Sequence, residues 1–425
     1  MKDTARRTSG RQEAPHIGQL AIAALLDARA TLHATIMRTG MSVVSAMMEE
    51  DRVRLCGPRY AHDGDRRAHR GGHVDGELVL GGRRVRVRRP RVRSADGHEI
   101  ALPTWEHFAC DDPLNERAVE QMVLGVSTRN YARSLEPVPN EIATRGASKS
   151  AVSRRFVAAT SEALTAMMSR DLGGISLCAV IIDGIHMGEH LVVVALGIDE
   201  SGEKHVLGLQ EGATENEAVC TTLLADIVAR GVRTSRSMLF VIDGSKGLAA
   251  AIRKNFGKRA LIQRCQVHKR RNVEDHLPES MKKSVGRTMS TAYRCGNVDR
   301  AKRLLNALAK QLEKKHPSAA GSLREGLDET LTVMRFNLPM WLERTLSTTN
   351  TIEFVNSRIR KTTHNVTKWN GGTMVLRWLA VALGEASKTF RKLRGYKGMP
   401  TLVAALKAHD ANLTPTSIDD AQKAA

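Results

Sequence analysis

The sequence predicts an α/β fold with a mixed β-sheet, preceded by an α+β region and interrupted by a long all-helical stretch. Three observations carry this prediction. Apolar, β-branched runs over residues 177–209 are separated by short turns, which is typical of three consecutive strands. Two further runs, "SMLFVID" and "RALIQRC", alternate with helix-like stretches, so the expected order is βββαβαβ. Residues 274–345 contain no strand-like run and read as several helices.

Residues 17–110 predict a helix and an arginine-rich hairpin, after a basic tail over residues 1–16 that we expect to be disordered. The helix is expected over the Ala-, Leu- and Met-rich residues 17–50. The segment "GELVLGGRRVRVRRPRVRS" then predicts a β-hairpin around its Gly-Gly pair. Strand alternation places Arg86 and Arg88 on the face opposite the valines, and we predict that this ribbon contacts DNA phosphates. The alternative is a solvated edge strand that its charges protect from pairing.

Residues 111–172 predict a DNA-binding region of the helix-turn-helix type. Two short helices are expected first, the second capped by Ser127, and a third helix begins behind Ser148. In a helix-turn-helix domain the last helix contacts the bases. Its basic side chains are Lys149, Arg154 and Arg155. An ordinary helical hairpin is the alternative.

Two of the predicted strands end in an aspartate, Asp183 in "AVIIDG" and Asp243 in "FVIDG". In an open α/β sheet, ligand-binding groups gather where strands end. Two carboxylates from two such strands can share Mg²⁺ ions, and a pair of ions serves phosphodiester cleavage. Taken singly, each Asp-Gly pair has a plain alternative as a turn.

A third carboxylate is expected from a later helix over residues 350–363. Glu353 is the candidate, and Arg360 lies seven residues further on the same face. This lone acid stands among bases suited to DNA phosphates: Arg358, Arg360 and Lys361. A surface salt bridge is the alternative.

The charge of the chain favours a polyanionic partner. Lys and Arg number 65 against 45 acids, a formal charge of +20, so double-stranded DNA is the expected partner. Aromatic residues make up only 4%, fewer than extended single-strand binding requires. The six scattered cysteines indicate a reduced compartment, and no signal peptide or apolar span points to a membrane. Cys56 and three nearby histidines do not follow a common zinc spacing.

Several segments resemble the bacterial mutator-type insertion-sequence transposases. They include "IDGSKGL", "QRCQVHKRRN", "TTNTIEFVNSRIRKTT" and "WNGGTMVLRWLA", and the resemblance covers most of the chain beyond about residue 75. Members of this family are DDE transposases with a ribonuclease-H-like core. The resemblance therefore implies a core over residues 173–273 and 346–395, interrupted by an all-helical insertion over residues 274–345. Residues 396–425 are left as a C-terminal tail.

The resemblance also implies roles for single residues. Asp183, Asp243 and Glu353 match the DDE triad, which would hold two ions of Mg²⁺ or Mn²⁺ for two-metal cleavage. A Cys-x-x-His motif matches Cys265 and His268, with His268 expected near the bound DNA and Cys265 in packing. The bases that follow would hold DNA: Lys269, Arg270 and Arg271.

The implied activity is cleavage at the element's terminal inverted repeats and strand transfer into target DNA. A homodimer or larger assembly on DNA, in the bacterial cytoplasm, is expected with it. Two alternatives stay open: a catalytically inactive transposon-derived DNA-binding protein, and a ribonuclease-H-like nuclease that only hydrolyses.

Overall fold

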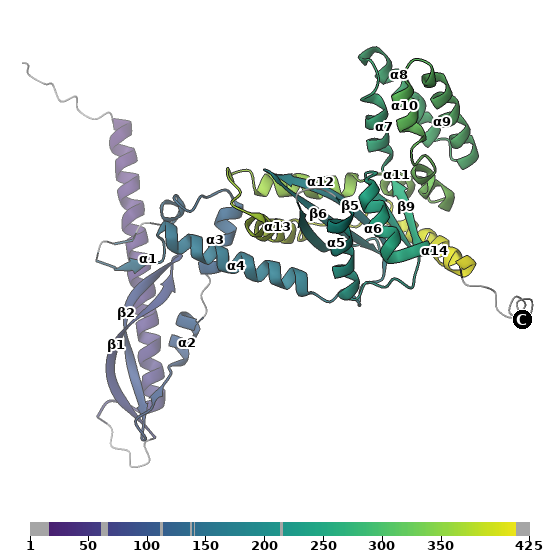
Figure 1. Ribbon diagram of the computed structural model, residues 1–425. Coiled ribbons are helices and arrows are strands. Elements are labelled where there is room, and N and C mark those ends of the chain that lie inside the picture. The colour runs from purple at the N-terminus through teal and green to yellow at the C-terminus, as the bar shows by residue number, and fades with distance from the viewer. Residues whose placement is uncertain are drawn as a thin grey trace, which may run out of the picture. The chain divides into compact units, whose positions relative to one another are not determined.

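The computed structural model describes residues 17–60, 67–110, 114–136, 138–139, 141–212 and 216–413 (Figure 1). The tail predicted over residues 1–16 lies outside this part. The chain divides into two compact units, Met1–Ala159 and Thr160–Ala425. None of the described helices combines the length and the apolar composition that a bilayer span requires.

The first unit is built on one long helix and a β-hairpin. Helix α1 (Ile17–Cys56) is longer than the predicted helix over residues 17–50. At the hairpin turn, Gly81 and Gly82 have φ angles of 60° and 77°, a conformation that side chains disfavour. Val87 is buried in one cluster with residues of α1, whereas Arg86 and Arg88 are exposed, so the predicted hairpin and its two faces are confirmed. The hairpin strands and their neighbours are β1 (Ala68–Leu80), β2 (Arg83–Ser94), β3 (Glu99–Ile100), α2 (Pro103–Cys110) and α3 (Leu114–Val123).

The second helix of the predicted helix-turn-helix is absent from the described residues. A single 3-10 turn (Tyr131–Ser134) stands in its place, and Ser127 Oγ accepts the Asn130 N–H within a turn before it. Strand β4 (Thr144–Arg145) then pairs with β2, which draws this segment into the sheet. The third helix, α4 (Lys149–Ser169), does begin behind Ser148, whose Oγ accepts the Ala151 N–H at 3.3 Å.

The second unit contains a five-stranded mixed sheet in the order β7-β6-β5-β8-β9. The first three strands form an antiparallel meander, and β8 and β9 add in parallel to β5, so the predicted βββαβαβ order is confirmed. Helix α5 (Glu217–Ala229) and helix α6 (Lys246–Phe256) connect the parallel strands. The strands are β5 (Leu177–Met187), β6 (His190–Asp199), β7 (Lys204–Gly212), β8 (Met238–Ile242) and β9 (Ala260–Arg264).

Helices cover both faces of this sheet (Figure 1). Side chains alternate along each strand, so Ile182 and Phe240 pack against α5 and α6. On the other face, Ile181 and Val241 pack in a cluster with residues of α12 (Asn350–Thr362) and α13 (Gly372–Ser387). The strands are therefore buried on both faces, as their continuous apolar sequences indicate.

The chain between β9 and α12 is helical throughout, in agreement with the absence of strand-like runs over residues 274–345. This segment has its own hydrophobic cluster, which includes Val273, Met289 and Leu305. Its helices are α7 (Gln266–Glu274), α8 (Glu279–Tyr293), α9 (Val298–Glu313), α10 (Pro317–Arg324) and α11 (Met340–Leu346).

The end of the chain differs from the predicted tail over residues 396–425. Residues Met399–Leu413 form helix α14. Leu402 and Leu406 of this helix are buried in the cluster beneath the sheet, because apolar residues recur there at helical spacing. The tail prediction is wrong for this helix, and residues 414–425 lie outside the described part.

Candidate active site

Strands β5 and β8 carry the two predicted aspartates to the same edge of the sheet. The prediction that both strands end there is wrong for Asp183, because β5 stays paired with β6 as far as Met187. Ile181 pairs in parallel with Val241, so the same register two residues further brings Asp183 beside Asp243. Asp243 follows the last residue of β8, and its Oδ1 accepts the Ser245 N–H at 3.0 Å. Ser245 in turn caps α6, so the carboxylate stands at a fixed strand-to-helix turn.

Helix α12 brings the third predicted carboxylate to this edge. Glu353 lies in its first turn, and its Oε1 accepts the Thr349 hydroxyl at 3.1 Å. One turn further, the Asn356 amide donates to Asp183 Oδ2 at 2.9 Å. Asn356 was not predicted, although its position three residues after Glu353 on the same helix face was a usable signal.

The surroundings of Asp183 oppose its ionisation. Burial, followed by the neighbouring Asp243 and Glu353 carboxylates, raises the pKa of Asp183 to about 6. His268 opposes this effect through its positive charge. A cation between these carboxylates would offset their repulsion, and three oxygen-donor groups suit a hard divalent ion.

The Cys-x-x-His motif joins α7 to the start of α12. The Cys265 Sγ accepts the Thr349 N–H at 3.4 Å and lies 3.4 Å from the Thr349 hydroxyl oxygen, and Cys265 is fully buried. His268 Nδ1 lies 3.3 Å from the same hydroxyl, and Nε2 lies 3.6 Å from Glu353 Oε1. Cys265 and His268 thus both contact Thr349, whose hydroxyl Glu353 accepts, and the packing role of Cys265 stays a prediction.

The two motif side chains also shift each other's protonation. The hydrogen bond with Cys265 raises the pKa of His268 to about 8, against the effect of burial. Burial opposes ionisation of Cys265, but hydrogen bonds with His268 and Thr349 outweigh it and lower the pKa of this thiol. A charged imidazole at neutral pH is consistent with the expectation that His268 lies near DNA.

The structure separates the predicted DNA-binding residues into exposed and buried ones. Most are exposed: Arg86, Arg88, Lys149, Arg154, Arg358, Arg360 and Lys361. Arg155 is partly buried. Lys269 is only 3% exposed, and its ammonium donates to the carbonyls of Ser322 and Glu325, both at 2.7 Å. The Lys269 side chain points from α7 toward α10, and these contacts favour a structural role over the predicted DNA contact.

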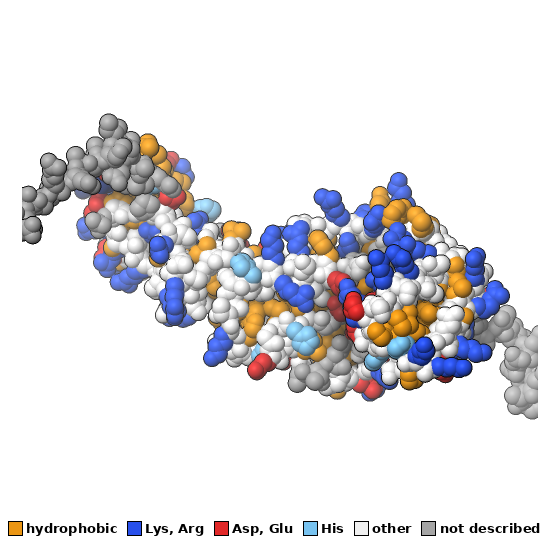
Figure 2. All heavy atoms as spheres, turned by 90° about the horizontal axis from the view of Figure 1, so that it is seen from above, with side chains coloured by type: hydrophobic (Ala, Val, Ile, Leu, Met, Phe, Trp, Pro, Cys, Tyr) orange, Lys and Arg blue, Asp and Glu red, His pale blue; other side chains and the backbone are white. Residues whose placement is uncertain are grey.

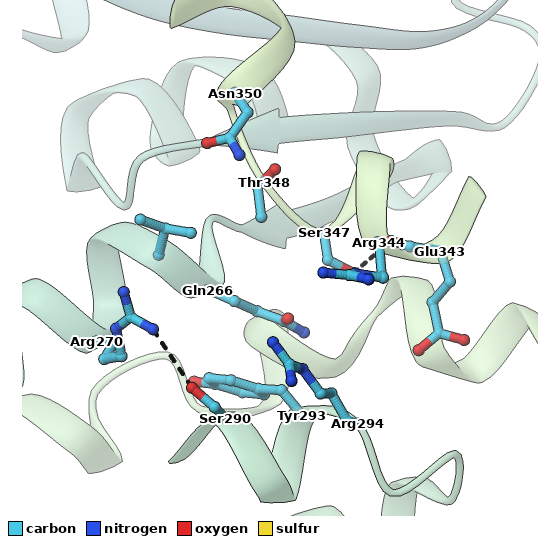
Figure 3. Close-up of a pocket in the computed structure, with 11 residues that line it drawn as sticks. Gln266, Arg270, Ser290, Tyr293, Arg294, Glu343, Arg344, Ser347, Thr348 and Asn350 are labelled. Atoms are coloured by element: carbon cyan, nitrogen blue, oxygen red, sulfur yellow. Dashed lines mark hydrogen bonds between the residues drawn. The ribbon is translucent and has the colours of Figure 1, made fainter. Parts of the chain in front are cut away.

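Arg270 instead lines a cavity of about 200 Å³ between α7, α8, α11 and the start of α12 (Figure 3). Its Nη1 lies 3.4 Å from Ser290 Oγ. Two further arginines, Arg294 and Arg344, also line this space. The cavity is therefore basic, and Thr348 and Asn350 connect it to the helix that carries Glu353.

A separate group of possible metal ligands lies at the turn between β6 and β7. Ligand atoms of Asp199, Glu203 and His205 lie within 4.8 Å of one another. Asp199 Oδ1 accepts the Ser201 and Glu203 N–H groups, and Oδ2 lies 2.8 Å from His205 Nε2. These hydrogen bonds stabilise the turn, and they account for the short distances between the three side chains. Among the residues considered as zinc ligands from the sequence, Cys56 is buried in the core of the first unit, and His62 lies outside the described residues.

Comparisons with known proteins find relatives along most of the chain. The family model described as "Transposase, Mutator family" matches residues 16–392. The transposase for insertion sequence element ISRM5 of Rhizobium meliloti (strain 1021) is 28% identical over 378 residues, which are 86% of this chain and 90% of the relative. The transposase for IS256 in transposon Tn4001 of Staphylococcus aureus is 25% identical over 335 residues, 75% of this chain and 82% of the relative. The transposase for IS1081 of Mycobacterium tuberculosis is 24% identical over 380 residues, 86% and 88% of the two chains.

Proposed function

Since the chain belongs to the Mutator family of transposases, we propose that it is a DDE transposase. It binds the ends of its own insertion sequence, cuts the DNA there and joins the freed ends to target DNA. The observation that carries this proposal is the convergence of Asp183, Asp243 and Glu353 from β5, β8 and α12 on one sheet edge. The catalytic part is a ribonuclease-H-like core over residues 173–273 and 346–395.

The donor set at this edge fits Mg²⁺ or Mn²⁺, because three carboxylates offer hard oxygen ligands and no thiolate. Two such ions, when bound, would supply Lewis-acid stabilisation of the attacking and leaving oxygens. The chain's own residues hold the ligands in place: Asn356 orients Asp183, and Thr349 orients Glu353. His268, with its pKa raised to about 8, places positive charge beside the site for a DNA phosphate.

The DNA contacts divide by the kind of information they carry. Arg86 and Arg88 on the ribbon would bind phosphates and position the duplex, and the start of α4 would read base edges. The exposed bases of α12 and Arg270 would hold the strand near the carboxylates. Figure 2 supports such a partner, since Lys and Arg side chains are spread over the face drawn, whereas Asp and Glu gather in few places. The proposed substrates are the terminal inverted repeats and target DNA, acted on in the bacterial cytoplasm by two or more copies of the chain.

The test uses DNA duplexes that carry the inverted repeats flanking the gene. Asp183→Asn, Asp243→Asn and Glu353→Gln should each abolish cleavage and joining, while affinity for the duplex and thermal stability change little. The reason is that each substitution removes a metal-bound charge and keeps the side-chain volume. Full activity of any one variant would remove that residue from the mechanism. Cleavage without joining by the unmodified protein would favour a nuclease that only hydrolyses, and binding without cleavage an inactive DNA-binding protein.

A further inference from the structure

A groove of about 560 Å³ lies beside the start of α12, next to the candidate active site. Its walls come from α11, α12 and the segment that follows α13. The residues used in the argument are Trp341, Arg344, Thr348, Asn350, Phe354 and Arg394. Phe354 is the neighbour of Glu353 in the chain, so the groove opens within one helical turn of the candidate metal ligand.

Two large aromatic side chains are exposed here, in a chain with few aromatics. Trp341 is 44% exposed and Phe354 is 57% exposed. Exposing such rings to water is unfavourable unless a partner covers them. Their flat faces are the usual platforms on which an unpaired base stacks.

Arginines accompany both rings. The Arg394 guanidinium carbon lies 3.9 Å from the centroid of the Trp341 ring, and that of Arg344 lies 5.5 Å from it. Arg358 lies 5.4 Å from the Phe354 ring centroid. Within the described part of the chain, none of these three arginines forms an ion pair with a carboxylate. Their charge is thus left for a phosphate, and a guanidinium plane can itself stack on a base.

The groove wall is held rigidly before any ligand arrives. Thr345 Oγ1 lies 2.8 Å from the Trp341 carbonyl and 3.1 Å from the Arg394 carbonyl, which ties the two segments together. Gly395 follows with a φ of 87°, and a Cβ there would stand 2.5 Å from the Leu342 nitrogen. Only glycine permits this close approach, so the Arg394–Trp341 pair is preorganised.

A simpler explanation is that the arginines only cover the rings and stabilise the surface. That explanation accounts for the stacked pairs, but not for a hollow lined by polar Thr348 and Asn350 between two exposed rings. We propose that this groove binds a single unpaired nucleotide of the DNA end, with its base stacked on Trp341 and its phosphate on Arg394 and Arg344. The proposal rests on the proposed DNA-processing function and deepens it. Extraction of one nucleotide from the duplex would let the scissile phosphate approach the three carboxylates.

The test measures DNA binding without catalysis, in the full chain carrying Asp243→Asn. The probes are duplexes from the gene's flanks in which one base pair at a time, around the cleavage position, is replaced by a mismatch. A mismatch removes the cost of unpairing, so at one position it should raise the affinity of the Asp243→Asn protein. Trp341→Ala should weaken binding of the matched duplex roughly 10- to 100-fold and abolish the gain from the mismatch. Trp341→Phe should restore most of both effects, because the flat ring returns.

Two controls separate stacking from other losses. Met340→Ala alters the neighbouring side chain, which is 61% exposed, and should leave both measurements unchanged. Arg394→Gln should lower the slope of log affinity against log salt by about one, whereas Trp341→Ala should leave that slope alone. The proposal is overturned if no mismatch position favours binding, or if the gain from a mismatch persists in a folded Trp341→Ala protein. Either result leaves the cleavage assays of the triad variants unaffected, so the two proposals fail separately.

Discussion

At the scale of single residues, Asp183 is the most constrained side chain of the site. It is crowded by Asp243 and Glu353, and the Asn356 amide donates a hydrogen bond to it at 2.9 Å. The other end of that amide, Oδ1, is buried with no hydrogen-bond partner among the described residues. An unsatisfied buried oxygen is costly, so an amide held this way indicates a functional constraint on Asp183.

Asn356→Ala should therefore impair cleavage by misorienting Asp183. We expect a loss of about 10- to 100-fold in cleavage rate, the usual effect of removing a group that orients a metal ligand. Raising the concentration of Mg²⁺ should recover part of this loss. The measurement is a titration of cleavage rate against Mg²⁺. Ser357→Ala, at an exposed position on the same helix, is the matched control and should behave as the unmodified protein. An unchanged Asn356→Ala titration would remove this residue from the site.

Residue types alone predicted the carboxylates but not their surroundings. Asp183 and Asp243 could be found because an apolar run followed by a carboxylate is a local pattern, although only β8 ends there and β5 continues to Met187. The burial of Lys269 could not be found, because its partners are carbonyls more than fifty residues further along the chain. Asn356 was missed because its contact with Asp183 spans 173 residues.

At the scale of elements, β2 presents arginines in two different states. Arg86 and Arg88 are exposed, with Asp75 only 3.9 Å from Arg86. Arg91 on the same strand is engaged by Glu99 at 2.6 Å. The Arg86–Asp75 pair is long and exposed to solvent, whereas the Arg91–Glu99 pair is short and partly buried. Arg86 and Arg88 therefore keep more of their charge for phosphates than Arg91 does, so the two groups should contribute differently to DNA binding.

Replacement of Arg86 and Arg88 by Ala should weaken binding to every duplex alike. The slope of log affinity against log salt should fall by about two, roughly one for each lost phosphate contact. Arg91→Ala is the control and should change the slope little, because the charge of Arg91 is already paired with Glu99.

Arg154→Ala should instead reduce the difference in affinity between inverted-repeat DNA and random DNA, because base contacts specify. The same effect of both changes on both DNAs would contradict this division between β2 and α4.

The helices between β9 and α12 share their own hydrophobic core, so we expect their stability to be separable from that of the sheet. Leu305 of α9 is fully buried in that core. Leu305→Ala should cost about 2–5 kcal/mol from lost burial and the cavity left behind. Hydrogen exchange should then speed up in α8, α9 and α10 but not in β5 and β8. Equal acceleration in the sheet would show that the two cores unfold together.

At the scale of the whole molecule, the sequence predicted best where structure follows local pattern. The order of strands and helices along the chain, the hairpin turn and the helical segment all follow from periodicity and turn residues. The missing second helix of the helix-turn-helix could not be predicted, since β4 is recruited by β2 from about sixty residues away. The predicted tail over residues 396–425 is wrong for helix α14, because Leu402 and Leu406 recur at helical spacing and find their partners in a cluster of residues from distant parts of the chain.

We propose that three carboxylates from separate elements form one cation-dependent site, and metal replacement tests this most directly. Protein stripped with a strong chelator should cut inverted-repeat DNA again with Mg²⁺ or Mn²⁺, which accept octahedral oxygen ligands. Ca²⁺ should support DNA binding but little cleavage, because its longer and looser coordination misaligns the reacting oxygens. Zinc held by Cys265 and His268 is the competing idea. Cleavage that resists the chelator, or that returns with Zn²⁺ alone, would contradict the assignment to Asp183, Asp243 and Glu353.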